Sequence, residues 1–173
     1  MTIVAMSIMT SCLGSDSVDT KYRDANTAYY EQQLNLKDES GENYYSLVVS
    51  DWDPKASVLV HWYNDPTKTT GNISPLYSST VDVKYKLTLY DGTAADSSYT
   101  STSPADSVTR LSLTGVVSGW PIALTKMHIG DSCRIVIPWS QGYGSSDYGD
   151  IKAYSTLILD LKLVGVPYYE AKP

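Results

Sequence analysis

The chain has 173 residues, 42% of them hydrophobic, and a formal net charge of -6. This length allows one or two domains, and the apolar fraction is sufficient for a packed core. Binding to nucleic acid needs clustered Lys and Arg, whereas here 13 basic residues face 19 acidic ones and form no basic run, which excludes that class of partner. The aromatic residues are 15 Tyr and 4 Trp with no Phe, so nearly every ring carries a polar group that needs a partner or water when buried.

A short apolar run opens the chain and ends in small residues before Cys12. The run is too short to span a bilayer, and the chain turns polar directly after it. The pattern resembles the lipobox of bacterial lipoproteins, although Met9 stands where leucine is usual and the basic segment of a secretory signal is missing. We expect residues 1–12 to be a lipoprotein signal segment with lipidation at Cys12. This would place the protein in a bacterial cell envelope, lipid-anchored on the periplasmic side or outer surface. A buried or disordered N-terminal stretch is the alternative.

Residues 13–43 are expected to form a tether and an N-terminal helix. Residues 14–20 are rich in Ser and Asp, a composition typical of flexible linkers. Asp19 or Thr20 is a candidate N-cap, because a short polar side chain there can accept a backbone N–H of the first turn. The helix would dock or act as a spacer through one face, which comprises Tyr22, Ala25, Tyr29 and Tyr30.

Two short strands are expected next, at residues 44–49 and 57–63, separated by the turn sequence Asp53-Pro54-Lys55. They would complete a sheet formed by later strands. Residues 64–79 are polar and contain two prolines, which predicts a long loop that is either functional or mobile.

Apolar and polar residues alternate with a period of two at residues 81–89, 133–137 and 157–163. This period is typical of strands with one buried face. Between them, apolar residues at helical spacing predict a short helix, with Pro121 in its first turn, where the missing N–H is harmless. One short helix on the inner face of an antiparallel sheet is an α+β architecture. The apolar helical positions are Trp120, Ala123, Leu124 and Met127.

Three short motifs follow one another between residues 111 and 144. A strand is expected to run into Val116 and Val117, Gly119-Trp120 opens the helix, a turn at residues 127–131 leads to a strand ending at Pro138, and Tyr143-Gly144 follows. The order and spacing resemble the FKBP-type peptidyl-prolyl cis-trans isomerases, whose pattern joins a V-I-x-G-W segment, an M-x-x-G turn and a P-x-x-x-x-Y-G loop.

The resemblance extends on both sides, from residue 81 to residue 166. Residues 83–98 resemble the family's V-x-Y-x-G-x-L-x-D-G-x-x-F-D-S-S, with Leu87 in place of a glycine and Ala95 in place of a phenylalanine. Residues 156–161 resemble the closing T-L-x-F-D-V strand, with Leu159 in place of phenylalanine. The resemblance implies an FKBP-like antiparallel β-sheet wrapped around one short helix, with an N-terminal helical extension. Residues 44–166 would form the isomerase domain and residues 167–173 a C-terminal tail.

The resemblance also implies a set of site residues. Trp120 would form the floor of a proline pocket, while Val116 and Val117 would contact the peptide backbone, the latter through its N–H. Tyr143 would donate its hydroxyl to a substrate carbonyl. The remaining walls would be formed by Tyr85, Asp96, Ile151, Tyr154 and Leu159.

These residues also fit purely structural roles. Trp120, Tyr85 and Leu159 are equally typical of a packed core, and Asp96 fits a side-chain cap of the turn at Ser97-Ser98. Asp96 would accept or orient polar contacts near the twisting bond if it belongs to the site.

Other kinds of site are not supported by the sequence. His61 and His128 have no Asp, Glu or Cys at ligand spacing, so we expect no metal, and no Ser-His-Asp arrangement is recognisable. With Cys12 lipidated, Cys133 would be left alone, and we expect it to be a small buried hydrophobe rather than part of a disulfide.

The sequence therefore predicts a peptidyl-prolyl isomerase that needs no cofactor and acts as a monomer on proline-containing polypeptides, assisting the folding of exported proteins. Because Ala95 and Leu159 replace aromatic residues, the pocket is expected to be wider and the activity weakened. Two alternatives stay open. One is a weakly active or inactive envelope lipoprotein that binds proline peptides or a partner, and the other is a module whose Tyr and Trp surface binds glycans.

Overall fold

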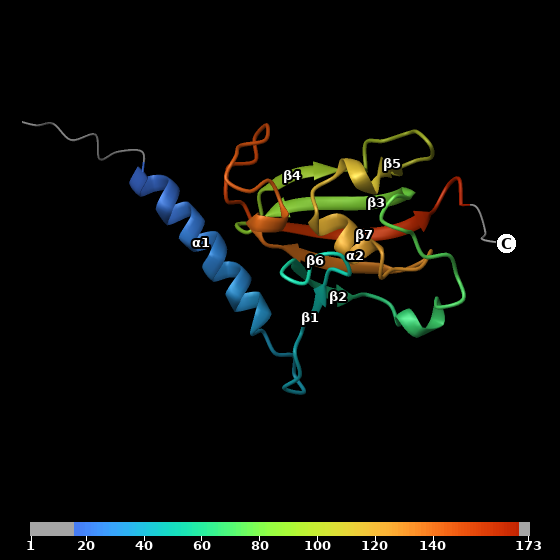
Figure 1. Ribbon diagram of the computed structural model, residues 1–173, viewed down its shortest axis with the longest axis horizontal. Helices are drawn as coiled ribbons and strands as arrows, with labels where there is room; N and C mark the ends of the chain where they lie inside the picture. Colours follow the sequence, from blue (N-terminus) through green and yellow to red (C-terminus); the bar gives the residue numbers. More distant parts are fainter. Residues whose placement is uncertain (1–15, 170–173) are drawn as a thin grey trace, which may run out of the picture.

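The computed structural model describes residues 16–169, and its centre is a seven-stranded antiparallel sheet. The strand order is β1-β2-β6-β7-β3-β4, and β5 pairs with β3. Helix α2 lies across one face of this sheet, while α1 runs diagonally past one end (Figure 1). The predicted α+β architecture is confirmed. The strands are β1 (Ser46–Val49), β2 (Ser57–Trp62), β3 (Thr80–Leu89), β4 (Ala94–Ser97), β5 (Thr109–Ser112), β6 (Ser132–Ile137) and β7 (Leu157–Gly165), and the helices are α1 (Asp16–Leu34), α2 (Gly119–Leu124) and the 3-10 turns η1 (Pro66–Lys68), η2 (Leu113–Gly115) and η3 (Trp139–Gln141).

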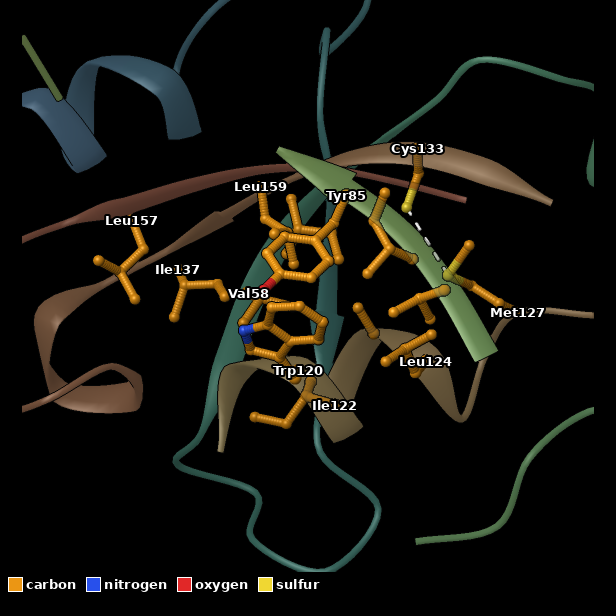
Figure 2. Close-up of a cluster of buried hydrophobic side chains, with 14 of the residues drawn as sticks. Val58, Tyr85, Trp120, Ile122, Leu124, Met127, Cys133, Ile137, Leu157 and Leu159 are labelled. Carbon is orange, nitrogen blue, oxygen red and sulfur yellow. Dashed lines mark hydrogen bonds between the residues drawn. The ribbon is translucent and has the colours of Figure 1, made fainter. Parts of the chain in front are cut away.

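The main core lies between α2 and the inner face of the sheet. All six residues of α2 are buried, and the strands contribute alternate side chains, as their period of two predicts. Figure 2 shows Trp120 of α2 on the side of the helix that faces Tyr85 of β3 and Leu159 of β7. The sheet residues that complete the core include Val58, Val60, Val81, Val83, Tyr85, Leu87, Cys133, Ile135, Ile137, Leu157, Leu161 and Leu163.

A second, smaller cluster lies on the outer face, where α1 packs. Its buried members are Tyr45, Leu59 and Val136, against which Tyr29 and Tyr30 of α1 pack. The expected apolar face of this helix is thus confirmed. The expected cap at Asp19 or Thr20 is wrong, and so is the expected flexible linker over residues 16–20, because α1 already begins at Asp16.

The strand expected to reach Val116 and Val117 ends earlier than predicted. β5 stops at Ser112, and the 3-10 turn η2 follows before Val116 resumes an extended conformation. The turn buries Leu113 completely, and the Leu113 N–H donates to the Ser79 carbonyl at 3.0 Å. The pairing of β5 with β3 therefore ends at Ser112, and the chain continues through Val116 and Val117 to the start of α2.

Three further element ends differ from the prediction. β1 begins at Ser46 rather than at residue 44, β2 ends at Trp62 rather than at residue 63, and α2 ends at Leu124 rather than at Met127. Met127 is nevertheless fully buried, because the turn after α2 points it back into the same core.

The loop at residues 64–79 is fastened to the protein by Asp131, whose side chain is 0% exposed. Its carboxylate accepts hydrogen bonds from the Thr69 hydroxyl at 2.5 Å, the His128 N–H at 2.7 Å and the Asn64 amide at 2.9 Å. Burial alone would raise the pKa of Asp131, but these hydrogen bonds hold the pKa below its ordinary value. The loop is thereby an ordered part of the fold.

Replacing this carboxylate is expected to weaken the protein in a pH-dependent way. A depressed pKa contributes stability above the unfolded value of ~3.9 that is lost as the pH falls toward the folded pKa. We therefore expect Asp131→Asn to lower the free energy of unfolding by about 1–3 kcal/mol at pH 7 and by less at pH 3. Urea titrations at both pH values measure this, and an equal difference at pH 7 and pH 3 would contradict it.

Candidate active site

An open cleft of about 420 Å³ lies at one end of the inner core. Strands β3, β4 and β5 form one side, the segment from η2 to α2 forms the floor, and the loop after η3 forms the other side. The cleft gathers six of the residues expected at the site. Its lining comprises Tyr85, Leu87, Asp96, Leu111, Gly115, Val116, Val117, Trp120, Tyr143 and Tyr148.

Trp120 forms the floor of the cleft from the first turn of α2. Only 6% of its surface is exposed, and its ring meets the Tyr85 ring edge to face, with centroids 5.0 Å apart at 81° (Figure 2). The preceding Gly119 explains how the helix comes so close to the sheet. A Cβ atom on Gly119 would lie 2.3 Å from Cγ2 of Ile137, well inside contact distance. The Gly-Trp pair of the motif therefore has a packing reason.

Tyr85 and Asp96 form a polar pair at the side of the cleft. The Tyr85 hydroxyl donates to Oδ2 of Asp96 at 2.6 Å, and the Ser97 N–H donates to Oδ1 at 2.7 Å. Burial and the adjacent carboxylate raise the pKa of Tyr85 above its ordinary value, so the phenol stays protonated and keeps donating. Asp96 thus lines the cleft and also accepts a local backbone N–H, while its contact with a substrate stays a prediction.

Tyr143 and Tyr148 form the opposite wall, in the loop at residues 142–154. Their rings are stacked 4.4 Å apart at an interplanar angle of 8°, and Tyr148 is 62% exposed. Burial raises the pKa of Tyr143, and the neighbouring Tyr148 and Asp96 add to this, so its hydroxyl is a donor at neutral pH. Tyr148 was not among the expected site residues. The sequence shows a tyrosine in a polar loop, but nothing local indicates that its ring folds back onto Tyr143.

Three expected wall residues lie outside the lining of this cleft. Ile151 is a buried residue of the loop at residues 142–154, and Leu159 is fully buried in β7. The Tyr154 ring lies against Trp139, with centroids 5.2 Å apart, and beneath the guanidinium of Arg23 at 5.8 Å. Direct contact of these three side chains with a substrate stays a prediction.

Within residues 16–169, no three His, Cys, Asp or Glu side chains are grouped so that they could hold a metal ion. Cys133 is fully buried, with its sulfur 3.8 Å from Sδ of Met127, and burial raises the pKa of its thiol to about 12. This confirms the expected role of Cys133 as a small buried hydrophobe.

No helix within residues 16–169 combines the length and apolar character needed to cross a bilayer. Cys12, the expected lipidation site, lies outside these residues.

The motifs of the cleft fall inside a family match. Residues 71–164 match the family described as FKBP-type peptidyl-prolyl cis-trans isomerase. The chain belongs to this family. The match covers Tyr85, Asp96, Trp120 and Tyr143 but leaves out α1, β1 and β2.

Individual relatives agree with this assignment. The chain is 38% identical over 103 residues to the FKBP-type peptidyl-prolyl cis-trans isomerase FkpA of Escherichia coli K12, covering 58% of this chain and 37% of that protein. It is 40% identical over 88 residues to FK506-binding protein 2 of Aspergillus oryzae, covering 50% of this chain and 64% of that protein. The chain thus spans little more than a third of FkpA and just under two thirds of the fungal protein.

Solved structures show the same fold. The crystal structure of FkpA from Escherichia coli superimposes with a TM-score of 0.67 and 26% identity, covering 87% of this chain and 63% of that one. A peptidyl-prolyl cis-trans isomerase from Pseudomonas syringae pv. tomato superimposes with a TM-score of 0.62 over 90% of this chain and 98% of that one. Its 24% identity supports the likeness of fold alone.

The close approach of Gly119 to β6 yields a stability prediction. Gly119→Ala should lower the free energy of unfolding by about 1–3 kcal/mol, because the added methyl overpacks against the branched Ile137 side chain. Gly115→Ala is a matched control, since a Cβ there would lie 3.9 Å from Cβ of Ser112, an ordinary contact distance, and should change stability by less than about 0.5 kcal/mol. Urea denaturation followed by Trp fluorescence measures both, and equal losses would argue against the packing account.

Proposed function

We propose that this protein catalyses cis-trans isomerisation of X-Pro bonds in polypeptides, with the proline ring seated on Trp120. The observation that carries the proposal is the cleft itself, an apolar floor enclosed by Tyr85, Leu87 and Leu111 within a chain of the FKBP-type family. Proline-containing polypeptides are the substrate class that follows.

The chemistry requires no reactive side chain. Rotation about the peptide bond breaks no covalent bond but must pass a twisted amide across a barrier of ~18–20 kcal/mol. A catalyst lowers this barrier when its pocket fits the twisted form better than either planar isomer. Twisting removes amide resonance and makes the carbonyl less dipolar, so a dry aromatic wall favours the twisted form over water. The buried Trp120 ring, met at its side by the Tyr85 ring, supplies such a wall.

Polar groups at the rim would orient the peptide. Val116, which is extended, and Val117 border the cleft ahead of α2, a position from which the Val117 N–H would donate to the substrate backbone. Tyr143 would donate its hydroxyl to a substrate carbonyl. Asp96, held by the Tyr85 hydroxyl, would accept or orient polar contacts near the twisting bond. Ile151, Tyr154 and Leu159 would shape the cleft from behind.

Tyr148 adds a wall that is specific to this loop. Its exposed ring, stacked on Tyr143, extends the apolar surface at the mouth of the cleft. We expect the Tyr148 ring to contact the substrate side chains that flank the proline.

A second candidate is a protein that binds proline peptides but turns them over slowly. Ala95 carries this alternative, because it is a half-buried residue that packs against the main core where the family pattern has phenylalanine. Loss of an aromatic ring beside the cleft would loosen the fit to the twisted amide. Measured turnover separates this candidate from an efficient isomerase.

The location and clients of the protein are part of the same proposal. The apolar run before Cys12 supports a lipid-anchored protein of a bacterial envelope, on the periplasmic side or outer surface. There it would assist the folding of exported proteins as a monomer.

The site assignment is tested by two matched tryptophan variants. Trp120→Leu should lower kcat/KM for a Leu-Pro tetrapeptide by at least tenfold, or about 1.4 kcal/mol of transition-state stabilisation, because the aromatic floor is lost. Trp52→Leu should leave kcat/KM within about twofold, since Trp52 is exposed, contacts Tyr77 and does not line the cleft. Circular dichroism confirms that both variants are folded. Similar losses in both variants, or no loss in either, would refute this site.

The anchor is tested separately from the activity. Acyl chains on Cys12, each contributing ~0.8 kcal/mol per buried methylene, would hold the protein on a membrane. We expect the wild type to label with fatty acid and sediment with membranes, and Cys12→Ser to lose the label without changing the activity of the purified domain. Cys133→Ala is the cysteine control and should keep the label. An unlabelled, fully soluble wild type would refute the anchor while leaving the isomerase proposal intact.

A further inference from the structure

Helix α1 contacts residues 152–156, where the loop that carries Tyr143 and Tyr148 joins β7. We call residues 152–155 the loop base. The side chain of Asn26 is 0% exposed, and its Oδ1 accepts the Thr156 N–H at 2.7 Å. The Thr156 hydroxyl donates back to the Asn26 carbonyl at 3.0 Å, and Asn26 Nδ2 donates to the Tyr22 carbonyl at 2.9 Å. A buried polar side chain is costly unless it is hydrogen-bonded. Because Asn26 makes these bonds, they fix α1 and Thr156 in one relative position.

One turn earlier, α1 contacts the residues just before Thr156. The Tyr22 and Ser155 hydroxyls are 2.8 Å apart and share a hydrogen bond. The Arg23 guanidinium lies over the Tyr154 ring at 5.8 Å, and the Lys152 ammonium lies over the Tyr22 ring at the same distance. The helix therefore contacts the loop base through consecutive residues.

The loop base is linked in turn to the cleft. The Tyr154 N–H donates to the Gly144 carbonyl at 2.7 Å, and the Gly144 N–H donates to the Trp139 carbonyl at 3.0 Å. Gly144 directly follows Tyr143 in the cleft wall. Tyr154 has a φ of +63°, a conformation that a non-glycine residue keeps only when its surroundings impose it. Contacts from α1 on one side and from the Gly144 carbonyl on the other supply that constraint.

We propose that α1 is a brace of the substrate cleft, with Asn26 and Tyr22 as positioning residues that hold the base of the loop at residues 142–155 and thereby the Tyr143–Tyr148 wall. This inference rests on the proposed isomerase function of the cleft. It assigns a role to a helix that lies outside the family-matched residues 71–164. Neither residue touches the cleft, so both act through the loop.

A loosened loop has a distinct kinetic signature. If the binding-competent loop is populated in only a fraction of molecules, the apparent dissociation constant rises by the inverse of that fraction, whereas the bound complex is unchanged. A brace defect therefore raises KM at constant kcat. A variant that merely misfolds in part loses active molecules and so lowers the apparent kcat at constant KM.

The experiment compares Asn26→Ala with Asn35→Ala in the full chain. Asn35 donates the same kind of bond, from Nδ2 to the Glu31 carbonyl four residues earlier at 2.8 Å, but it is exposed. Isomerisation of a Leu-Pro tetrapeptide is followed by NMR exchange over a range of peptide concentrations. We expect KM to rise about fivefold in Asn26→Ala if the competent fraction falls to about one fifth, with kcat unchanged. Asn35→Ala should match the wild type.

Amide hydrogen exchange of Tyr154 is the second readout, and it does not depend on catalysis. Exchange should be faster in Asn26→Ala and unchanged in Asn35→Ala, while amides of the central strand β7 stay protected in both. Tyr22→Phe, which removes only the hydroxyl, serves if Asn26→Ala does not fold, and it should show a smaller shift in the same direction. Unchanged KM and unchanged Tyr154 exchange in a folded variant would overturn the brace.

A failure of the isomerase proposal is distinguishable from a failure of the brace. If the wild type shows no turnover, the dissociation constant of the same peptide, measured by quenching of Trp fluorescence, replaces KM in the comparison, and Tyr154 exchange is read as before. A braced but inactive cleft would still show weaker peptide binding and faster exchange in Asn26→Ala.

Discussion

The burial of α2 against the inner face of the sheet is the constraint on which the rest of the structure depends. A helix of six residues has no stability of its own, so its position is set by packing alone. The absence of a side chain at Gly119 lets the helix approach Ile137, and this approach lowers Trp120 into the space beside Tyr85. The floor of the cleft is therefore a consequence of core packing, because the same contacts that bury α2 also position Trp120.

The abundance of tyrosine and the absence of phenylalanine have a partial explanation in the structure. Several tyrosine rings pack against apolar surface while their hydroxyls find polar partners at the boundary. Tyr85 reaches Asp96 beside the cleft, and Tyr22 reaches Ser155 beneath the loop. On the outer face, Tyr63 bonds Asp160, whose carboxylate also accepts two bonds from Arg134 at 2.7 and 2.9 Å. In each case the tyrosine hydroxyl bonds a polar side chain nearby.

Different helices cover the two faces of the sheet, and both helices contact parts of the cleft or its loop. α2 covers the inner face and contributes the cleft floor, whereas α1 covers part of the outer face and reaches around to the loop that forms the cleft wall (Figure 1). Because Thr156 directly precedes β7, a shift of α1 would act on the loop base as well as on the outer face of β2 and β6, where Tyr29 and Tyr30 pack. An element added outside the family's matched region is in this way coupled to the mouth of the cleft.

The alternation of apolar and polar residues predicted the long strands β3, β6 and β7 and the short helix, because the direction of a side chain along a strand or helix depends only on local geometry. Trp120 and Tyr143 were instead expected at the site from the resemblance of their motifs to the family, and both line the cleft. Strand β4 was not predicted. The end of β5 at Ser112, the stacking of Tyr148 and the bonds of Asn26 were decided by the tertiary structure. Asn26 and Thr156 are 130 positions apart, and no local period records which distant partner will satisfy a buried amide. Contacts of that kind exist only once the sheet has brought both ends of the chain together.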